Sequence, residues 1–217
     1  MSIRENKPIR FAIAHLFTTG RDALKYSILH FACIRYEEGS VPQMNDWLIN
    51  PDLKQKDGVR IRVVARTGIK RPDVENKPLW TEIRGQVLSF LEGVDFIFIR
   101  NSDVDSQWFE NVVYKDMTPP TLIDLTEMYQ FFLPENPIPY SESELINLGE
   151  SIQVYKGNRK LHKVINGMYF IMDRILRVIL LCEEINTELH FPVYSLLHWA
   201  LSAEGNQPSF EAIYKVA

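Results

Sequence analysis

A nearly continuous apolar segment at residues 9–17, IRFAIAHLF, constrains the fold more than any other feature of this sequence. A strand with one face in solvent alternates apolar and polar residues, whereas a strand covered on both faces reads as an apolar run. The segment therefore predicts a central strand buried on both faces, which ends at the Thr-Thr-Gly of residues 18–20. Strands predicted at residues 26–36 and 46–50 follow after short turns, so the domain opens with an antiparallel meander.

Downstream of the meander, helical and strand patterns alternate along the chain. Residues 51–78 are mostly polar and contain Pro72 and Pro78, which predicts a long irregular connection. The remaining predicted helices are residues 79–91, 105–113, 126–132, 141–149, 162–184 and 192–203, and the remaining strands are residues 94–99 and 122–125. A meander followed by alternating helices and strands indicates an α/β domain with a mixed sheet.

The composition of the 217-residue chain is that of a folded globular protein, with 46% apolar and 24% charged residues. No run approaches the roughly 20 apolar residues of a membrane span, and the charged start lacks the apolar core of a secretory signal. Cys33 and Cys182 stand apart without metal or redox spacing, as in a reducing cytosol, so we expect a cytoplasmic protein without membrane contact. The net charge of −4 disfavours a protein that coats nucleic acid but allows a local basic patch.

Three separated motifs point, in chain order, to one family: residues 15–20 (HLFTTG), residues 100–105 (RNSDVD) and residues 162–167 (HKVING). Asn50-Pro51 and the Thr-Gly-Ile of residues 67–69 stand between the first two motifs. The ordered set resembles the DnaQ-like 3′–5′ exonucleases, the DEDDh group, which includes the proofreading subunit of DNA polymerase III and ribonuclease T.

The resemblance covers about residues 9–184, the greater part of the chain. It implies an α/β, ribonuclease H-like fold, in which helices flank a mixed five-stranded sheet. It also implies two regions, an exonuclease-fold domain at residues 1–184 and a C-terminal helical extension at residues 185–217.

In active members of this family, four carboxylates bind two divalent ions, Mg²⁺ or Mn²⁺, and a histidine acts as general base. The matching positions here are His15, Phe17, Asp105 and Gly167, with His162 at the position of the base. A phenyl ring and a glycine cannot ligate a metal through their side chains, and imidazole suits Zn²⁺ better than Mg²⁺. We therefore expect no metal cofactor and no catalysis, with Asp105 as the one retained ligand.

Other interpretations of these positions stay open. Replacement carboxylates would leave an active metal-dependent exonuclease, and the nearby ones are Asp22, Asp103 and Asp173. Alternatively, His15 and Phe17 fill the space that the metals would occupy, and the phenyl ring packs as core. Arg100 either binds phosphate or pairs with Asp103 or Asp105.

If catalysis is lost, the function that remains is binding. Basic residues gather in two runs, residues 60–71 and residues 156–163, and contacts of this kind to phosphate weaken as salt rises. The candidate nucleic-acid-binding residues are Arg60, Arg62, Arg66, Arg100, Lys160 and Lys163. Trp80 and Trp108 would stack on bases if they are exposed. The alternative is that the charge runs are solvated faces and the tryptophans are core.

These observations predict a degenerate exonuclease-like domain that binds single-stranded nucleic acid or a partner in DNA or RNA metabolism. The alternative is a protein-interaction scaffold that docks on a polymerase- or helicase-type protein. Salt separates the two, because an apolar protein interface does not weaken steeply as salt rises.

Overall fold

A computed structural model of the chain describes residues 8–38, 40–51, 61–100, 102–125, 163–168 and 171. Five strands form one sheet in the order β3-β2-β1-β4-β5. The strands are β1 (Arg10–Thr18), β2 (Ile28–Glu37), β3 (Gln43–Leu48), β4 (Phe96–Ile99) and β5 (Thr121–Asp124). The β1, β2 and β3 strands are antiparallel, whereas β4 runs parallel to β1 and β5 parallel to β4. The predicted mixed five-stranded sheet is therefore confirmed.

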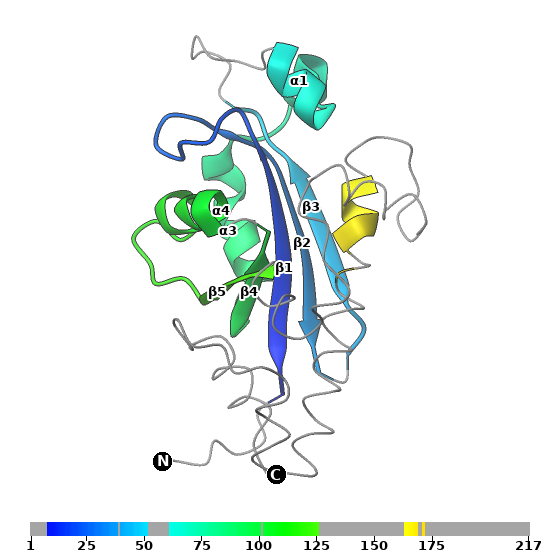
Figure 1. Cartoon of the computed structure of the whole chain (residues 1–217), viewed down its shortest axis with the longest axis vertical. Coiled ribbons are helices and arrows are strands. Elements are labelled where there is room, and N and C mark those ends of the chain that lie inside the picture. Colours follow the sequence, from blue (N-terminus) through cyan, green and yellow to red (C-terminus); the bar gives the residue numbers. More distant parts are fainter. Residues whose placement is uncertain are drawn as a thin grey trace, which may run out of the picture.

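The β1 strand occupies the centre of this sheet (Figure 1). Ile13 pairs with Ile34 of β2 on one side and with Phe98 of β4 on the other. Seven of its nine residues are buried, on both faces of the sheet. The apolar run at the start of the sequence thus forms the central, doubly covered strand that its pattern predicts.

Helices α3 (Trp80–Phe90) and α4 (Ser102–Trp108), with the π-helix η1 (Phe109–Val113), cover one face of the sheet. Figure 1 shows α3 and α4 on the same side of β1. Residues two apart on a strand share a face. The buried cluster on this face joins the sheet to these helices through Ala12, Ala14, Phe31, Cys33, Ile97, Ile99, Ile83, Val87, Trp108, Phe109 and Val113.

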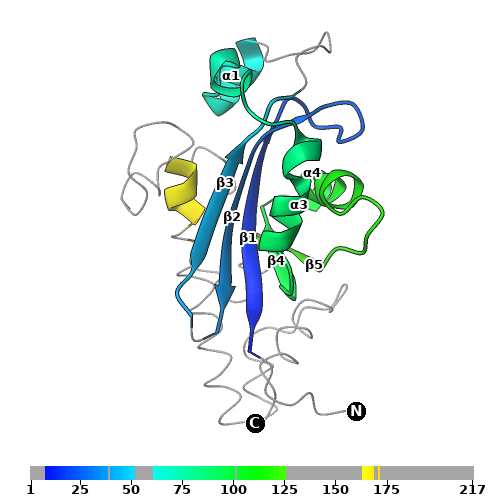
Figure 2. The ribbon, with the colours of Figure 1, turned by 180° about the vertical axis from the view of Figure 1, so that it is seen from behind.

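The opposite face of β1 carries Phe11, Ile13, His15 and Phe17. The Phe11 ring packs edge-on against Phe98 of β4, with ring centroids 5.3 Å apart. Helical residues 163–168 are also largely buried, and both views draw them beside β3 (Figure 2). The sheet is therefore covered on both faces, as in an α/β domain.

The prediction of an irregular connection over residues 51–78 is wrong. This segment contains helices α1 (Ile61–Thr67) and α2 (Arg71–Val74). Pro72 stands in the first turn of α2, where a missing N–H costs nothing, so it starts a helix rather than breaking one. Gly68 ends α1 with φ of 71°, and its N–H donates to the Val64 carbonyl. The many charged residues of this segment obscured a short series of apolar residues, which the structure buries.

Several boundaries differ from the sequence predictions. The second strand begins at Ile28 rather than at residue 26, so Tyr26 belongs to a loop. The third strand ends at Leu48. The helix predicted from residue 105 begins at Ser102 and changes to π-helical winding at Phe109.

Other sequence predictions fall outside the described residues. These are the helices at residues 126–132, 141–149 and 192–203, most of the helix at residues 162–184, and the boundary between residues 184 and 185. Within the part of the chain that the structure describes, no helix is long and apolar enough to cross a membrane.

Candidate functional site

The C-terminal half of β1 positions His15 and Phe17. Both side chains lie on the same face of the sheet. Phe17 pairs with His30 of β2, and His15 pairs with Ala32 of β2, which in turn pairs with Asp46 of β3. The parallel pairing of β1 with β4 ends at Ile13, so His15 and Phe17 lie beyond the point where the chain leaves β4 for α4. In a parallel sheet, the carboxyl ends of the strands are the usual place for a ligand site.

Aromatic rings occupy this face. The His15 and Phe17 rings meet edge to face with centroids 4.7 Å apart, and Phe17 lies 6.0 Å from the His30 ring. Phe17 is 2% exposed and His30 is fully buried. His30 Nε2 lies 3.1 Å from Asp46 Oδ2, within hydrogen-bond distance. The phenyl ring thus packs as core, and it does so against a histidine–carboxylate pair that sequence reasoning missed. The signal was a histidine inside the apolar run of β2.

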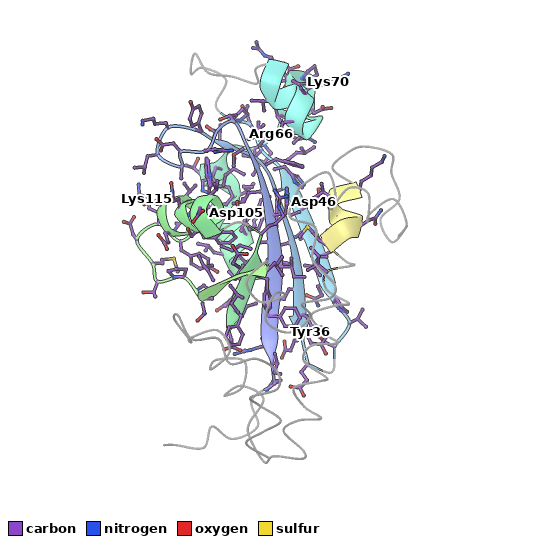
Figure 3. The ribbon with its side chains drawn as sticks, viewed as in Figure 1. Tyr36, Asp46, Arg66, Lys70, Asp105 and Lys115 are labelled. Atoms are coloured by element: carbon purple, nitrogen blue, oxygen red, sulfur yellow. The ribbon has the colours of Figure 1, made fainter. Side chains whose placement is uncertain are left out.

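Asp105 and Gly167 come from opposite sides of β1. Asp105 is half-buried on α4, which follows β4, and Figure 3 shows it on the β4 side. Gly167 is buried within helical residues 163–168, on the β3 side. His162 lies outside the described residues.

These residues do not fit a pair of Mg²⁺ or Mn²⁺ ions. Phe17 and Gly167 present no ligand atom in their side chains, and His15 offers nitrogen where hard cations take oxygen. Among the described residues, no three His, Cys, Asp or Glu side chains are grouped so that they could hold a metal ion. Phe17, Gly167 and His15 therefore do not supply the oxygen ligands that two such ions need.

The loop from β1 to β2 begins at the Thr-Thr-Gly motif and is closed by its own hydrogen bonds. The Thr18 hydroxyl donates to the Gly20 carbonyl at 2.7 Å. The Thr19 N–H donates to the Ser27 carbonyl at 2.8 Å, and the Ser27 N–H donates to the Thr19 hydroxyl at 2.9 Å. A Cβ atom at Gly20 would lie 2.4 Å from Cγ of Tyr26, so the glycine is what admits the tyrosine ring here.

Asp22 fixes the tip of this loop. Its Oδ1 accepts a 3.0 Å hydrogen bond from the Leu24 N–H, and its Oδ2 lies 2.8 Å from Lys25 Nζ. The hydrogen bond and charge of Lys25 lower the pKa of Asp22, and Asp22 in turn raises the pKa of Lys25. The Tyr26 N–H donates to the Asp22 carbonyl at 3.0 Å, which places the tyrosine after the turn. Hydrogen bonds thus close the loop at its base and at its tip.

A cavity of about 560 Å³, widely open to solvent, lies between this loop and α1. Figure 1 shows the loop and α1 at the same end of the sheet. The Arg66 guanidinium of α1 donates to the Thr18 carbonyl at the end of β1. The lining residues are Thr19, Gly20, Arg21, Asp22, Lys25, Tyr26, Val63 and Arg66. Three of these described lining residues are cationic and one is a carboxylate.

Of the predicted binding residues, Arg66 lines this cavity. Arg100 is half-buried directly after β4, and Lys163 is half-buried at the start of helical residues 163–168. Arg60, the Arg62 side chain and Lys160 lie outside the described residues. Sequence reasoning missed Arg21 and Lys25, although both closely follow the Thr-Thr-Gly motif.

The suggestion that Trp108 stacks on bases is wrong. Trp108 is 1% exposed and belongs to the core between the sheet and its helices. Trp80 packs against the same core, 6.2 Å from the Phe31 ring, with its Nε1 donating to the Val112 carbonyl at 3.4 Å. The alternative interpretation, tryptophans as core, holds for Trp108, and Trp80 is packed against that core.

Comparison with solved structures identifies the class of fold. The nuclease domain of 3′hExo, a DEDDh family member, bound to rAMP, is 15% identical with a TM-score of 0.56, over 78% of this chain and 92% of that one. Exonuclease X in complex with 5′ overhanging duplex DNA is 16% identical with a TM-score of 0.50, over 76% and 92%. E. coli exonuclease I in complex with a dT13 oligonucleotide is 14% identical with a TM-score of 0.54, over 79% and 43%.

The chain thus spans less than half the length of exonuclease I. No protein-family model and no curated protein sequence matches it. At these identities the likeness shows the fold, and the fold is that of the DnaQ-like 3′–5′ exonucleases.

Proposed function

We propose that this domain binds single-stranded nucleic acid without hydrolysing it. The observation that carries the proposal is the ring contact between His15 and Phe17 on the strand that supplies two carboxylates in active relatives of this fold. Phosphodiester hydrolysis by two metals needs oxygen ligands that hold both ions close together. The His15–Phe17 pair, with Phe17 2% exposed, supplies no oxygen ligand from these two side chains, which supports the proposal.

The cavity beside β1 supports the binding half of the proposal. Its described lining includes the cationic residues Arg21, Lys25 and Arg66, in a chain whose net charge is −4. Local positive charge attracts phosphate, and an aromatic ring such as that of Tyr26 offers a flat surface to a base. The structural neighbours include complexes with duplex DNA, with dT13 and with rAMP, which is consistent with a nucleotide ligand.

The test combines a nuclease assay with a binding assay on the full chain. A 5′-labelled single strand of DNA or RNA is incubated with Mg²⁺ or Mn²⁺, and fluorescence anisotropy is read in parallel in EDTA. We expect no shortening, together with binding in EDTA that weakens steeply as salt rises. Shortening that Asp105→Ala abolishes would show a working metal site and refute the proposal. Absence of any binding at low salt would favour a domain that docks on protein.

A further inference from the structure

Arg100 directly follows β4, at the carboxyl ends of the parallel strands β1 and β4. Ile13 of β1 pairs with Phe98 of β4, and this pair is the last one between the two strands. Two residues further along, the two chains reach His15 and Arg100. Arg100 therefore leaves the sheet beside the half of β1 that carries His15 and Phe17.

The side chain of Arg100 stands apart from the acidic residues that follow it in sequence. Arg100 is half-buried, and among the residues that the structure describes its guanidinium has neither an ion pair nor a hydrogen bond. The ion pair with Asp103 or Asp105, one of the two interpretations that the sequence left open, is therefore not formed. A charge that is partly removed from water lowers stability unless an opposite charge offsets the loss. An anion from outside the chain would provide that opposite charge.

The side chains of β1 next to Arg100 also favour an anionic ligand. A phosphodiester carries one negative charge, and carboxylates repel it unless metal ions stand between them. His15 and Phe17 occupy the positions of two such carboxylates and carry no negative charge themselves. Arginine suits phosphate, because its guanidinium is always charged and two coplanar N–H groups match two phosphate oxygens.

We propose that Arg100 binds a phosphodiester group of a single strand beside His15 and Phe17, without a metal ion. The inference rests on the proposed function, because it names the group of the strand that this end of the sheet holds. The contact is a bidentate ion pair between the guanidinium and two oxygens of one internal phosphate. No bond of the strand is broken, because β1 has no carboxylate at these two positions to bind the ions that two-metal hydrolysis requires.

The experiment measures how tightly the full chain binds a 5′-labelled DNA strand of about ten nucleotides, by fluorescence anisotropy in EDTA. The slope of log affinity against log salt reports the number of phosphates that the protein neutralises, at about 0.7 for each phosphate of a single strand. Arg100→Gln should lower the affinity about tenfold at low salt and reduce the slope by about 0.7. Arg100→Lys should keep the slope and lose part of the affinity, because lysine has the charge without the planar pair of donors.

The matched control is Arg10→Gln. Arg10 is also a half-buried arginine, but it lies at the opposite end of β1, where its Nε is 3.6 Å from Asp95 Oδ2. This variant should leave both the affinity and the slope unchanged. A urea melt checks that all three variants are folded under the conditions of the assay.

A neutral linkage in the strand tests whether the contact is direct. One methylphosphonate replaces one phosphodiester, and a series of strands moves it along the chain one linkage at a time. At the linkage that Arg100 contacts, the neutral group should weaken binding by the wild type about tenfold and cause no further loss in Arg100→Gln. If every neutral linkage has the same effect in both proteins, Arg100 acts only through the fold and the inference is refuted.

The wild type and Arg100→Gln together separate this inference from the proposed function. If the wild type binds and Arg100→Gln has the same affinity and slope, the phosphate contact is refuted and nucleic-acid binding stays intact. Wild-type binding that appears only when Mg²⁺ is added also refutes the contact, because a metal ion then holds the phosphate. If the wild type binds no strand at low salt, the proposed function fails and the inference fails with it.

Discussion

Gly20→Ala tests how tightly the β1–β2 loop is packed around Tyr26. The added Cβ would lie 2.4 Å from Cγ and Cδ2 of the tyrosine ring and 2.6 Å from Cδ1. An ordinary contact is 3.4–4 Å, so the ring would have to retreat by about 1 Å. These atoms include Cγ, through which the ring is attached to the main chain by Cβ, and the Tyr26 N–H donates a hydrogen bond to the Asp22 carbonyl. The displacement of the ring therefore has to move the main chain of the loop.

The expected cost follows from two opposing terms. Overpacking of this kind costs about 1–3 kcal/mol. Alanine also restricts the unfolded chain, which returns about 0.4–1 kcal/mol where the glycine φ is not positive, as is the case at Gly20. We therefore expect the free energy of unfolding to fall by about 1–2 kcal/mol.

Urea denaturation, followed by circular dichroism at 25 °C, measures this change. The matched control is Gly85→Ala, in the exposed part of α3, where a Cβ would meet nothing within 4 Å. The control should gain about 0.5–1 kcal/mol. In a Tyr26→Ala background the penalty of Gly20→Ala should vanish, because the clash is with the ring. Stabilisation by Gly20→Ala in the wild-type chain, or an equal penalty in both backgrounds, contradicts the reasoning.

Three further predictions concern the core and the helix ends. Arg84→Met removes donors to two main-chain carbonyls after α4, at 2.9 and 2.7 Å, and should lower the free energy of unfolding by about 1–3 kcal/mol in a urea melt, with Arg84→Lys recovering only part. Phe17→Glu buries a carboxyl group among aromatic rings and should lower the free energy of unfolding by at least about 3 kcal/mol. A rise in the Tm of this variant when Mg²⁺ is added would contradict the absence of a metal site. Burial raises the pKa of the Cys33 thiol, so the free energy of unfolding that it contributes is fully present below the ordinary thiol pKa and falls as pH rises above about 9. In Cys33→Ala the free energy of unfolding should fall less steeply with pH, and equal slopes for the two proteins would refute this.

The sheet could be predicted from the sequence because its signals are local. The run at residues 9–17 has to lie at the centre of a sheet, and the motifs around it fix the order of the elements. The helices at residues 61–74 could not, because their apolar positions are few and lie among many charges. The cavity could not either, since Arg21 and Arg66 are far apart in sequence and come together only when α1 lies against the loop. A pattern within one segment says little about such a contact.

The packing around Phe17 limits what a single carboxylate at this position could do. Phe17 contacts His30, and His30 lies against Asp46, so the ring at the metal position belongs to a chain of contacts over three strands. A carboxylate residue in place of Phe17 would remove the aromatic neighbour of His30 and would place a negative charge there without a cation to bind. The cavity is built by other residues, from the loop and α1, and its shape does not depend on metal ligands. On the proposed function, loss of the carboxylates therefore removes the chemistry and leaves the ligand site in place.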